Sequence, residues 1–258
     1  MKEKPLMPVL FIGHGSPMNA IEDNRFTKDW ERVVKLIPRP DTILSISAHW
    51  YIPNTKVLAV EHPRTIHDFY GFPEVLYQQQ YPAAGNVPLA KRISSSTGAL
   101  LDTDWGLDHG TWSVLKRMYP DADIPTLQLS ISYTQPPRYH YEIMSMLKEL
   151  RAEDVLIIGS GNLVHNLQLV NWNMPDGGYE WNIEFARKMD SFIMNQDHDS
   201  VVNYLRLDTI ARKAHPTPDH FYPLLYALGA TEPTDTVQLF ADGYIYGSLS
   251  MNSFAFGL

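Results

Sequence analysis

The feature of this sequence that most constrains its fold is the alternation of short apolar runs with amphipathic segments of helical period. The apolar runs are predicted to be strands, at residues 9–12, 42–47, 56–61, 126–132, 155–158, 237–240 and 244–249. Runs such as 42–47 and 155–158 are apolar enough to be buried on one or both faces of a sheet. This alternation predicts the α/β class, with a central sheet flanked by helices.

The segments of helical period carry apolar residues that line a single face. The clearest faces consist of Phe26, Trp30, Val33, Val34 and Ile37, of Ile143, Met146, Leu147 and Leu150, and of Trp181, Phe185, Met189 and Phe192. Each face is expected to pack against the sheet. Pro38 and Pro40 are expected to end the first helix, because proline disfavours helix at the residue before it. Residues 172–179 are predicted to form a loop, and the last two strands a hairpin around Asp242 and Gly243.

The length of the chain suits one domain rather than two. α/β domains often reach 258 residues, and the sequence shows no internal repeat or low-complexity tract. Hydrophobic residues make up 44% of the chain and charged residues 19%, which is the balance of an ordinary globular protein. We therefore predict a single domain over residues 1–258.

The composition excludes several classes of function. The sequence has no cysteine, so disulfides, thiolate nucleophiles, cysteine-based zinc sites and iron–sulfur clusters are ruled out. A net charge of -8 without a Lys/Arg cluster argues against a nucleic-acid partner. No stretch approaches the roughly 20 apolar residues of a membrane span, and residues 9–12 are too short a run for a signal peptide. A cytoplasmic protein without membrane association is expected.

Histidines follow three of the predicted strands. His14 comes after strand 9–12, His49 after strand 42–47, and His165 a few residues beyond strand 155–158. In α/β sheets the loops at the carboxyl ends of the strands converge to form ligand sites. A single histidine at such a position is more often structural, but three in a chain without cysteine predict a shared functional site.

His220 lies in a different setting, a rigid loop with three prolines within residues 215–223. From spacing alone, His220 is compatible both with a metal ligand and with a buried structural histidine. Residues 223–228 predict a helix that ends at Gly229. Asp219, beside His220, either adjoins the site or caps this helix.

Two further segments combine histidine with glycine and aromatic residues. His109 either lines a substrate pocket or lies at the start of a helix that begins near Thr111. The aromatic-rich residues 67–72 form either a lid or pocket wall, or a packed surface loop. For His140 and His198 the structural interpretation is preferred.

Motifs of other enzyme classes receive little support. The sequence contains neither a Gly-x-Ser-x-Gly elbow nor a His-Glu-x-x-His pair. Gly159-Ser160-Gly161 follows a predicted strand as a phosphate-binding turn does, but the spacing fits neither the P-loop nor the dinucleotide fingerprint.

Five blocks of the sequence, taken in order, resemble one known family. The blocks are residues 13–18, 47–50, 106–110, 159–166 and 215–224, and they contain His14, His49, His109, His165 and His220. Each block alone is weak, but together they cover the chain from residue 13 to about residue 229. The sequence resembles the class III extradiol ring-cleaving dioxygenases, and specifically their DOPA dioxygenase-like branch.

The resemblance implies an α/β fold with a central mixed sheet and one divalent metal. In the family this metal is a nonhaem Fe(II), and some bacterial members of the branch carry zinc instead. The implied reactants are a small aromatic catechol such as DOPA and O2, and the ring opens beside the diol.

The family's site residues map onto the histidines of this chain. His14 and His49 match the two strand-end metal ligands. His220 stands in the C-terminal block that holds a metal-site histidine in this branch, whereas protocatechuate-type enzymes use a glutamate as third ligand. His165 matches a histidine that acts as acid/base or as a further metal ligand. The resemblance also allows His109 to hydrogen-bond the bound substrate or oxygen.

The chemistry explains why such residues are needed. Neutral imidazole ligates both Fe(II) and Zn(II), so the sequence does not select between these ions. Three protein ligands leave coordination positions open for both diol oxygens and O2. A histidine that titrates near neutral pH can take the catechol proton and return it later, and His165 is the candidate.

Two other functions remain open from the sequence. The same histidines could activate water in a zinc-dependent hydrolase. Alternatively, the chain is a zinc-binding or small-molecule-binding protein that uses this scaffold without catalysis.

Overall fold

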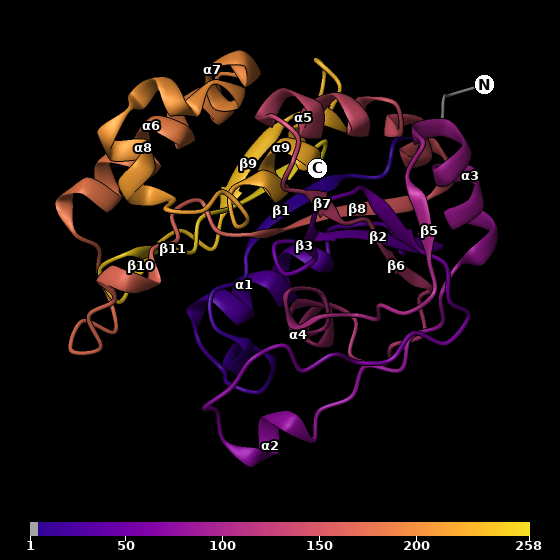
Figure 1. The fold of residues 1–258 in the computed structure, drawn as a ribbon. Coiled ribbons are helices and arrows are strands. Elements are labelled where there is room, and N and C mark those ends of the chain that lie inside the picture. The colour runs from indigo at the N-terminus through magenta and orange to yellow at the C-terminus, as the bar shows by residue number, and fades with distance from the viewer. Residues whose placement is uncertain (1–4) are drawn as a thin grey trace.

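One large sheet organises the protein, whose residues 5–258 are described by a computed structural model (Figure 1). Within these residues the sheet has six strands, in the order β6 (Thr126–Gln128), β2 (Thr42–Ser47), β8 (Val155–Gly161), β1 (Val9–Gly13), β12 (Ser253–Phe256) and β9 (Val237–Phe240). Strands β6, β2, β8 and β1 run parallel, while β12 is antiparallel to both neighbours. The α/β fold with a central mixed sheet is therefore confirmed.

Helices cover both faces of this sheet (Figure 1). The α-helices of the described residues are α1 (Arg25–Val34), α2 (Glu74–Tyr77), α3 (Val87–Thr97), α4 (His109–Met118), α5 (Pro137–Ser145), α6 (Glu180–Met194), α7 (His198–Val202), α8 (Thr209–Ala214) and α9 (Tyr222–Gly229). Short 3-10 helices lie at Pro17–Ala20, Lys148–Glu153, Leu167–Leu169 and Tyr204–Leu207. None of the helices in residues 5–258 is both long and apolar enough to cross a membrane.

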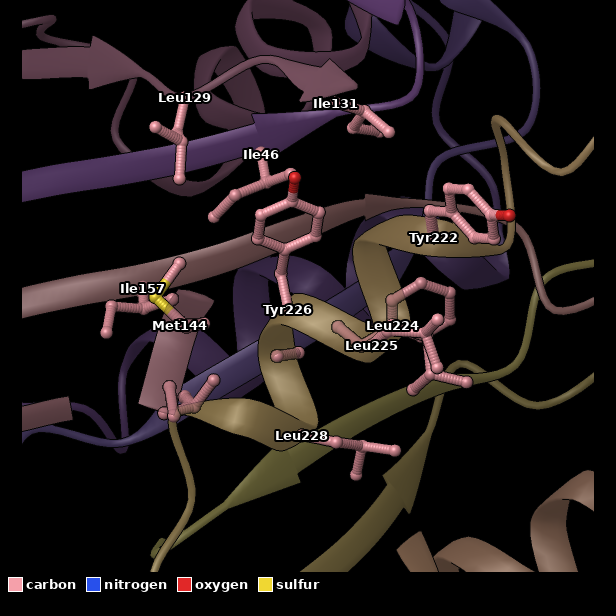
Figure 2. Close-up of a cluster of buried hydrophobic side chains, with 14 of the residues drawn as sticks. Ile46, Leu129, Ile131, Met144, Ile157, Tyr222, Leu224, Leu225, Tyr226 and Leu228 are labelled. Carbon is pink, nitrogen blue, oxygen red and sulfur yellow. The ribbon is translucent and has the colours of Figure 1, made fainter. Parts of the chain in front are cut away.

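The central strands are buried on both faces, as their continuous apolar sequences predict. In β1, Val9 and Phe11 pack in a cluster with α5 and α9, while Leu10 and Ile12 pack in a second cluster with α1 and α4. Every residue of α9 is buried. Figure 2 shows the α9 side chains beside those of the sheet strands. This packing fixes the start of α9, and with it the preceding loop, against the sheet.

Several predicted strands differ from the observed ones. The run 126–132 is two strands, because β6 joins the central sheet while β7 (Ile131–Ser132) pairs with β3 (Tyr51–Ile52). The run 56–61 shortens to β4 (Lys56–Leu58), which pairs with β5 (Leu100–Asp102).

The predicted hairpin around Asp242 and Gly243 is wrong. Strand β9 pairs with β12, and the run 244–249 divides into β10 (Tyr244–Ile245) and β11 (Leu249–Ser250), which pair with each other. Strand β12 was missed because it has only four residues, with one alanine between its two phenylalanines. Those phenylalanines are buried between β1 and β9, so tertiary packing rather than the local turn selects the partner of β9.

The helix predictions hold with one change. The faces expected for α1 and α6 pack in the core, and α1 ends at Val34, before Pro38. The third expected face is divided between α5 and the 3-10 helix Lys148–Glu153, and Met146 at the junction is exposed. Residues 172–179 form a loop, as predicted.

Candidate metal centre

Three histidines meet at the carboxyl edge of the parallel strands, where the end of β8 holds them. The backbone N–H of His14 donates to the carbonyl of Gly161 at 2.9 Å, and that of Ala48, next to His49, donates to Ser160 at 3.0 Å. On the other side, the N–H of Asn162 donates to the carbonyl of His220 at 2.9 Å. The parallel arrangement of β1, β2 and β8 thus brings together residues that are far apart in sequence.

Two glycines permit this close approach. A Cβ on Gly161 would lie 2.1 Å from the carbonyl oxygen of His220, and a Cβ on Gly110 would lie 2.3 Å from Oγ of Ser47. Any side chain at these positions would push the His220 loop away from β8, or α4 away from β2.

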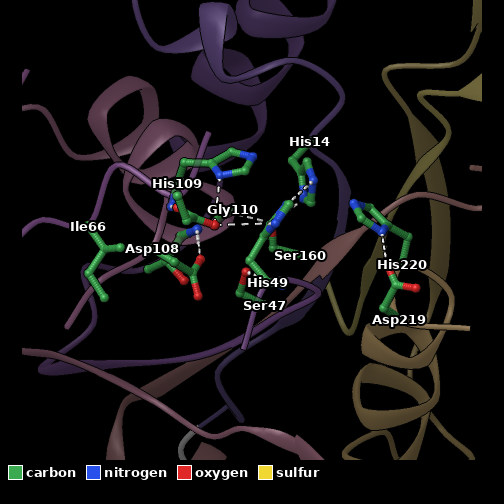
Figure 3. A network of polar contacts seen from close by, with 12 residues as sticks. His14, Ser47, His49, Ile66, Asp108, His109, Gly110, Ser160, Asp219 and His220 are labelled. Atoms are coloured by element: carbon green, nitrogen blue, oxygen red, sulfur yellow. Dashed lines mark hydrogen bonds and ion pairs between the residues drawn. The ribbon is translucent and has the colours of Figure 1, made fainter. Parts of the chain in front are cut away.

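The imidazoles of His14, His49 and His220 are close enough to share one ion (Figure 3). The Nε2 atoms of His14 and His49 lie 3.2 Å apart, and one ring nitrogen from each of the three histidines lies within 4.8 Å of the others. Two nitrogens that each bind zinc at about 2.0–2.1 Å are separated by roughly 3.3 Å in a tetrahedral site. The spacing between His14 and His49 therefore fits a shared metal.

The hydrogen bonds of His14 define its tautomer. The hydroxyl of Ser160 donates its hydrogen to the carbonyl of Gly110 at 2.5 Å, so its lone pair accepts from Nδ1–H of His14 at 2.9 Å. Nε2 of His14 is then unprotonated and directed toward His49.

Carboxylates contact Nδ1 of the other two histidines. Oδ2 of Asp68 lies 3.3 Å from Nδ1 of His49, and Oδ2 of Asp219 accepts a hydrogen bond from Nδ1 of His220. An ionised carboxylate can only accept, so Nδ1 of His220 carries the hydrogen and its Nε2 keeps a lone pair, and the contact with Asp68 favours the same tautomer for His49. Histidines that ligate metals are held in this way in proteins generally.

Burial keeps these imidazoles neutral. It lowers the pKa of His14, His49 and His220 well below 6.5, and neighbouring histidines lower each pKa further. Neutral imidazole is the form that binds metal. The donor set therefore suits a divalent ion that accepts nitrogen ligands.

His165 lies beside this cluster. Its ring stacks on that of His220, with centroids 3.4 Å apart and planes at 4°. Burial lowers the pKa of His165 to about 4, although nearby Asp219 opposes the shift, so the near-neutral titration expected from the sequence is not confirmed.

His109 approaches the cluster from the opposite side. It is the first residue of α4, its ring centroid is 3.8 Å from that of His49, and its Nδ1 lies 3.0 Å from Oδ2 of Asp68. All five histidines singled out in the sequence thus lie around one site.

Other predicted features have different outcomes. Asp219 is not a helix cap, because α9 begins at Tyr222 without a side-chain cap, and its carboxylate binds His220 instead. Phe69 packs edge-on against His109 and so belongs to the wall of the site. His140 is buried against Tyr226, and His198 contacts Tyr141, which agrees with structural roles for both histidines.

Sequence reasoning missed two residues that contact the candidate ligands. Asp68 was seen only as part of an aromatic segment, and Ser160 only as part of a possible phosphate-binding turn. Neither residue shows a motif of its own, because its role depends on contacts with histidines distant in sequence.

Comparison with known proteins agrees with this geometry. A family model described as the catalytic LigB subunit of aromatic ring-opening dioxygenase matches residues 8–256. A 4,5-DOPA dioxygenase extradiol of Escherichia coli K12 is 43% identical, over 97% of this chain and 95% of the relative. Another, from Beta vulgaris, is 36% identical over 98% of both chains.

A solved structure agrees as well. The crystal structure of an uncharacterized Escherichia coli K12 protein, 39% identical, matches with a TM-score of 0.85 and covers 97% of this chain and 100% of that protein. From the family match and these relatives, the chain belongs to the family of the catalytic LigB subunit of aromatic ring-opening dioxygenases, as an extradiol ring-cleaving enzyme.

Proposed function

We propose that this protein uses O2 to open the ring of a catechol such as DOPA, with one divalent ion held by His14, His49 and His220. The observation that carries the proposal is the convergence of these three neutral imidazoles, two of them buried and that of His49 half-buried, each with a polar atom beside Nδ1. Relatives named 4,5-DOPA dioxygenase extradiol in a bacterium and in plants support DOPA as the first substrate to test.

Enzymes of this family use a metal, and we propose Fe(II) or Zn(II) for this chain. Both ions accept imidazole nitrogen. When bound, Fe(II) would supply open coordination positions for the two diol oxygens and for O2. His14, His49 and His220 would hold the ion.

The stacking of His165 supports a role for it other than fourth ligand. The lone pair of an imidazole nitrogen lies in the plane of its ring, and the rings of His165 and His220 are parallel at 3.4 Å. The two rings therefore direct their lone pairs along parallel planes, so His220 would hold the ion while His165 stays free for proton transfer. We infer that His165 acts as the acid/base, taking a proton from a catechol hydroxyl and returning it later.

His109 is proposed to contact the bound substrate or oxygen. It lies beside His49 and is walled by Phe69, so its ring borders both the ligand cluster and an aromatic surface. We propose further that residues 1–258 act as one catalytic domain. The cytoplasmic location, expected because the sequence shows neither a signal-peptide run nor a membrane-length apolar stretch, stays a prediction.

The test is O2 uptake with DOPA by protein that has been loaded anaerobically with Fe(II) and analysed for iron. We expect a yellow ring-opened product and matching O2 consumption. His14→Ala should abolish both, while His62→Ala, a change at an exposed histidine, should leave both unaltered. Iron-loaded wild type that yields no product from a panel of catechols contradicts the proposal.

The alternative of a zinc-dependent hydrolase makes a different prediction. Zinc-loaded protein would then hydrolyse esters or amides at a rate independent of O2. A protein that binds zinc tightly but is inactive in every assay would instead be a binding protein on the same scaffold.

A further inference from the structure

Asp68 contacts two histidines of the site at once. Its Oδ2 lies 3.3 Å from Nδ1 of His49 and 3.0 Å from Nδ1 of His109. Its Oδ1 accepts a hydrogen bond of 2.9 Å from the backbone N–H of His109. One carboxylate therefore lies against two ring nitrogens and accepts one backbone N–H, and these groups belong to the loop after β2 and to the first residue of α4.

The loop that carries Asp68 is fastened to the segment that carries His109. The indole N–H of Trp112 donates to the carbonyl of Ile66 at 2.8 Å, and the N–H of Ile66 donates to Leu107 at 2.7 Å. The N–H of Leu107 in turn donates to the carbonyl of Arg64 at 2.9 Å. These bonds hold the carboxylate in place relative to both histidines.

We propose that Asp68 is a positioning residue that sets the tautomer and orientation of His49 and His109 together. An ionised carboxylate has no hydrogen to donate, so both imidazoles must present Nδ1–H to it. Their Nε2 atoms then carry lone pairs. The proposal rests on the proposed function in one respect, because it takes His49 to be a metal ligand.

This arrangement gives His109 a defined role. With Nδ1–H directed at Asp68, its Nε2 accepts a hydrogen bond from a substrate hydroxyl and does not donate one. The same carboxylate thereby prepares His49 to bind metal and His109 to accept a hydrogen bond from the substrate. The two rings lie 3.8 Å apart and both contact Asp68, so moving its carboxylate changes the orientation of both imidazoles at once.

The decisive variant is Asp68→Asn, compared with Asp68→Ala. Asparagine has the shape of aspartate, but in either orientation its NH2 group faces at least one of the three N–H donors. If Asp68 only fills space and holds the backbone, Asn should behave as wild type. If it sets the tautomers, both Asn and Ala should weaken zinc binding, by about 10–100-fold, the usual effect of losing a partner of a ligating histidine.

Zinc affinity is measured by competition with a chelator, so the result does not depend on turnover. Asp190→Asn serves as the matched control, because it removes another half-buried carboxylate whose hydrogen bonds go to Asn252. Its zinc affinity should equal that of the wild type. An Asp68→Asn variant whose affinity is closer to wild type than to Asp68→Ala overturns the proposal.

A second measurement uses the unmodified protein, so it holds even if the variants fail to fold. Long-range ¹H–¹⁵N spectra of the zinc-loaded wild type distinguish the two imidazole tautomers. We expect the Nδ1–H form for His49 and His109, and an Nε2–H form of His109 would contradict the role of Asp68.

Failure of this inference can be told apart from failure of the proposed function. A wild type that neither binds zinc nor opens catechols overturns the proposed function and this inference with it. A wild type that does both, alongside an unimpaired Asp68→Asn variant, overturns only the role of Asp68.

Discussion

At the scale of single residues, the site depends on what each histidine contacts through Nδ1. His14 donates to Ser160, while Nδ1 of His49 and His220 faces a carboxylate. Such partners fix ring orientation and raise the basicity of the ligating nitrogen. The orientation and tautomer of the candidate ligands therefore depend on neighbouring side chains as much as on the positions of the histidines themselves.

Ser160→Ala should weaken metal binding without unfolding the protein. The change removes the acceptor for Nδ1–H of His14 and frees the ring to turn, so the dissociation constant for zinc should rise by about 10–100-fold. Chelator competition measures it, with Ser95→Ala on the exposed side of α3 as the control. An unaltered affinity would show that Ser160 does not orient His14.

Replacing His165 and replacing His220 should have different effects on turnover and on metal binding. His165→Ala is expected to lower kcat by about 10²–10⁴-fold while leaving metal affinity intact, because it removes a proton carrier. His220→Ala should instead abolish tight metal binding. Metal analysis of both variants beside their kcat values tests this, and equal loss of metal in the two would make His165 a ligand.

The five histidines could be identified from sequence, but their partners could not. His14 and His49 follow long apolar strands, a pattern visible in one chain. Asp68 lies in an irregular loop, and its contacts with His49 and His109 exist only after folding. Asp219 was noticed but could not be separated from a helix cap, since both readings place an acid before a predicted helix.

At the scale of elements, β8 is the frame of the site. Its last two residues accept hydrogen bonds from His14 and Ala48, Asn162 just beyond it donates to His220, and Gly161 allows the His220 loop to lie against it. The position of the third candidate ligand thus depends on the contact between α9 and β8.

Gly161→Ala should damage both stability and the metal centre. The added Cβ would lie 2.1 Å from the carbonyl of His220, and relieving such overpacking typically costs about 1–3 kcal/mol in the free energy of unfolding. Urea denaturation measures the stability and chelator competition the metal affinity.

Gly98→Ala is the control for this prediction. Gly98 has φ of 75° but open space around it, so alanine there should reduce stability through backbone strain and leave zinc affinity unaltered. If Gly161→Ala also keeps full affinity, the contact between β8 and the His220 loop does not position the ligand.

Sequence predicted the long interior strands better than the short ones. Strand β8 begins with four consecutive apolar residues, and β2 joins three apolar residues to small polar ones, a composition that suits a buried parallel sheet whatever their neighbours. Strand β12 and the pairs β3–β7 and β10–β11 are short, and their partners are distant or set by packing. Local pattern carries little information about such pairings.

At the scale of the whole molecule, many histidines are buried uncharged. Burial lowers the pKa of His140 and of His215 to about 4, and it lowers the pKa of the three candidate ligands as well. In the unfolded chain these imidazoles have pKa values near 6.5 and bind protons below it. Acid therefore favours the unfolded state.

The metal-free protein should lose stability as the pH falls from about 6.5 toward about 4. Burial raises the pKa of Asp108 to about 6 and that of Asp190 to about 7, which opposes the trend, but the buried histidines outnumber these two carboxyls. Urea denaturation at about pH 7 and about pH 5 provides the test. Equal or greater stability at the lower pH would contradict the burial of neutral histidines.

The central claim is that one divalent ion binds to His14, His49 and His220 at the carboxyl edge of the sheet. X-ray absorption at the metal edge of wild type loaded with one equivalent of iron or zinc tests it most directly. We expect scattering from three imidazole rings, with metal–nitrogen distances of about 2.0–2.2 Å. A spectrum of oxygen ligands with one imidazole or none would contradict it.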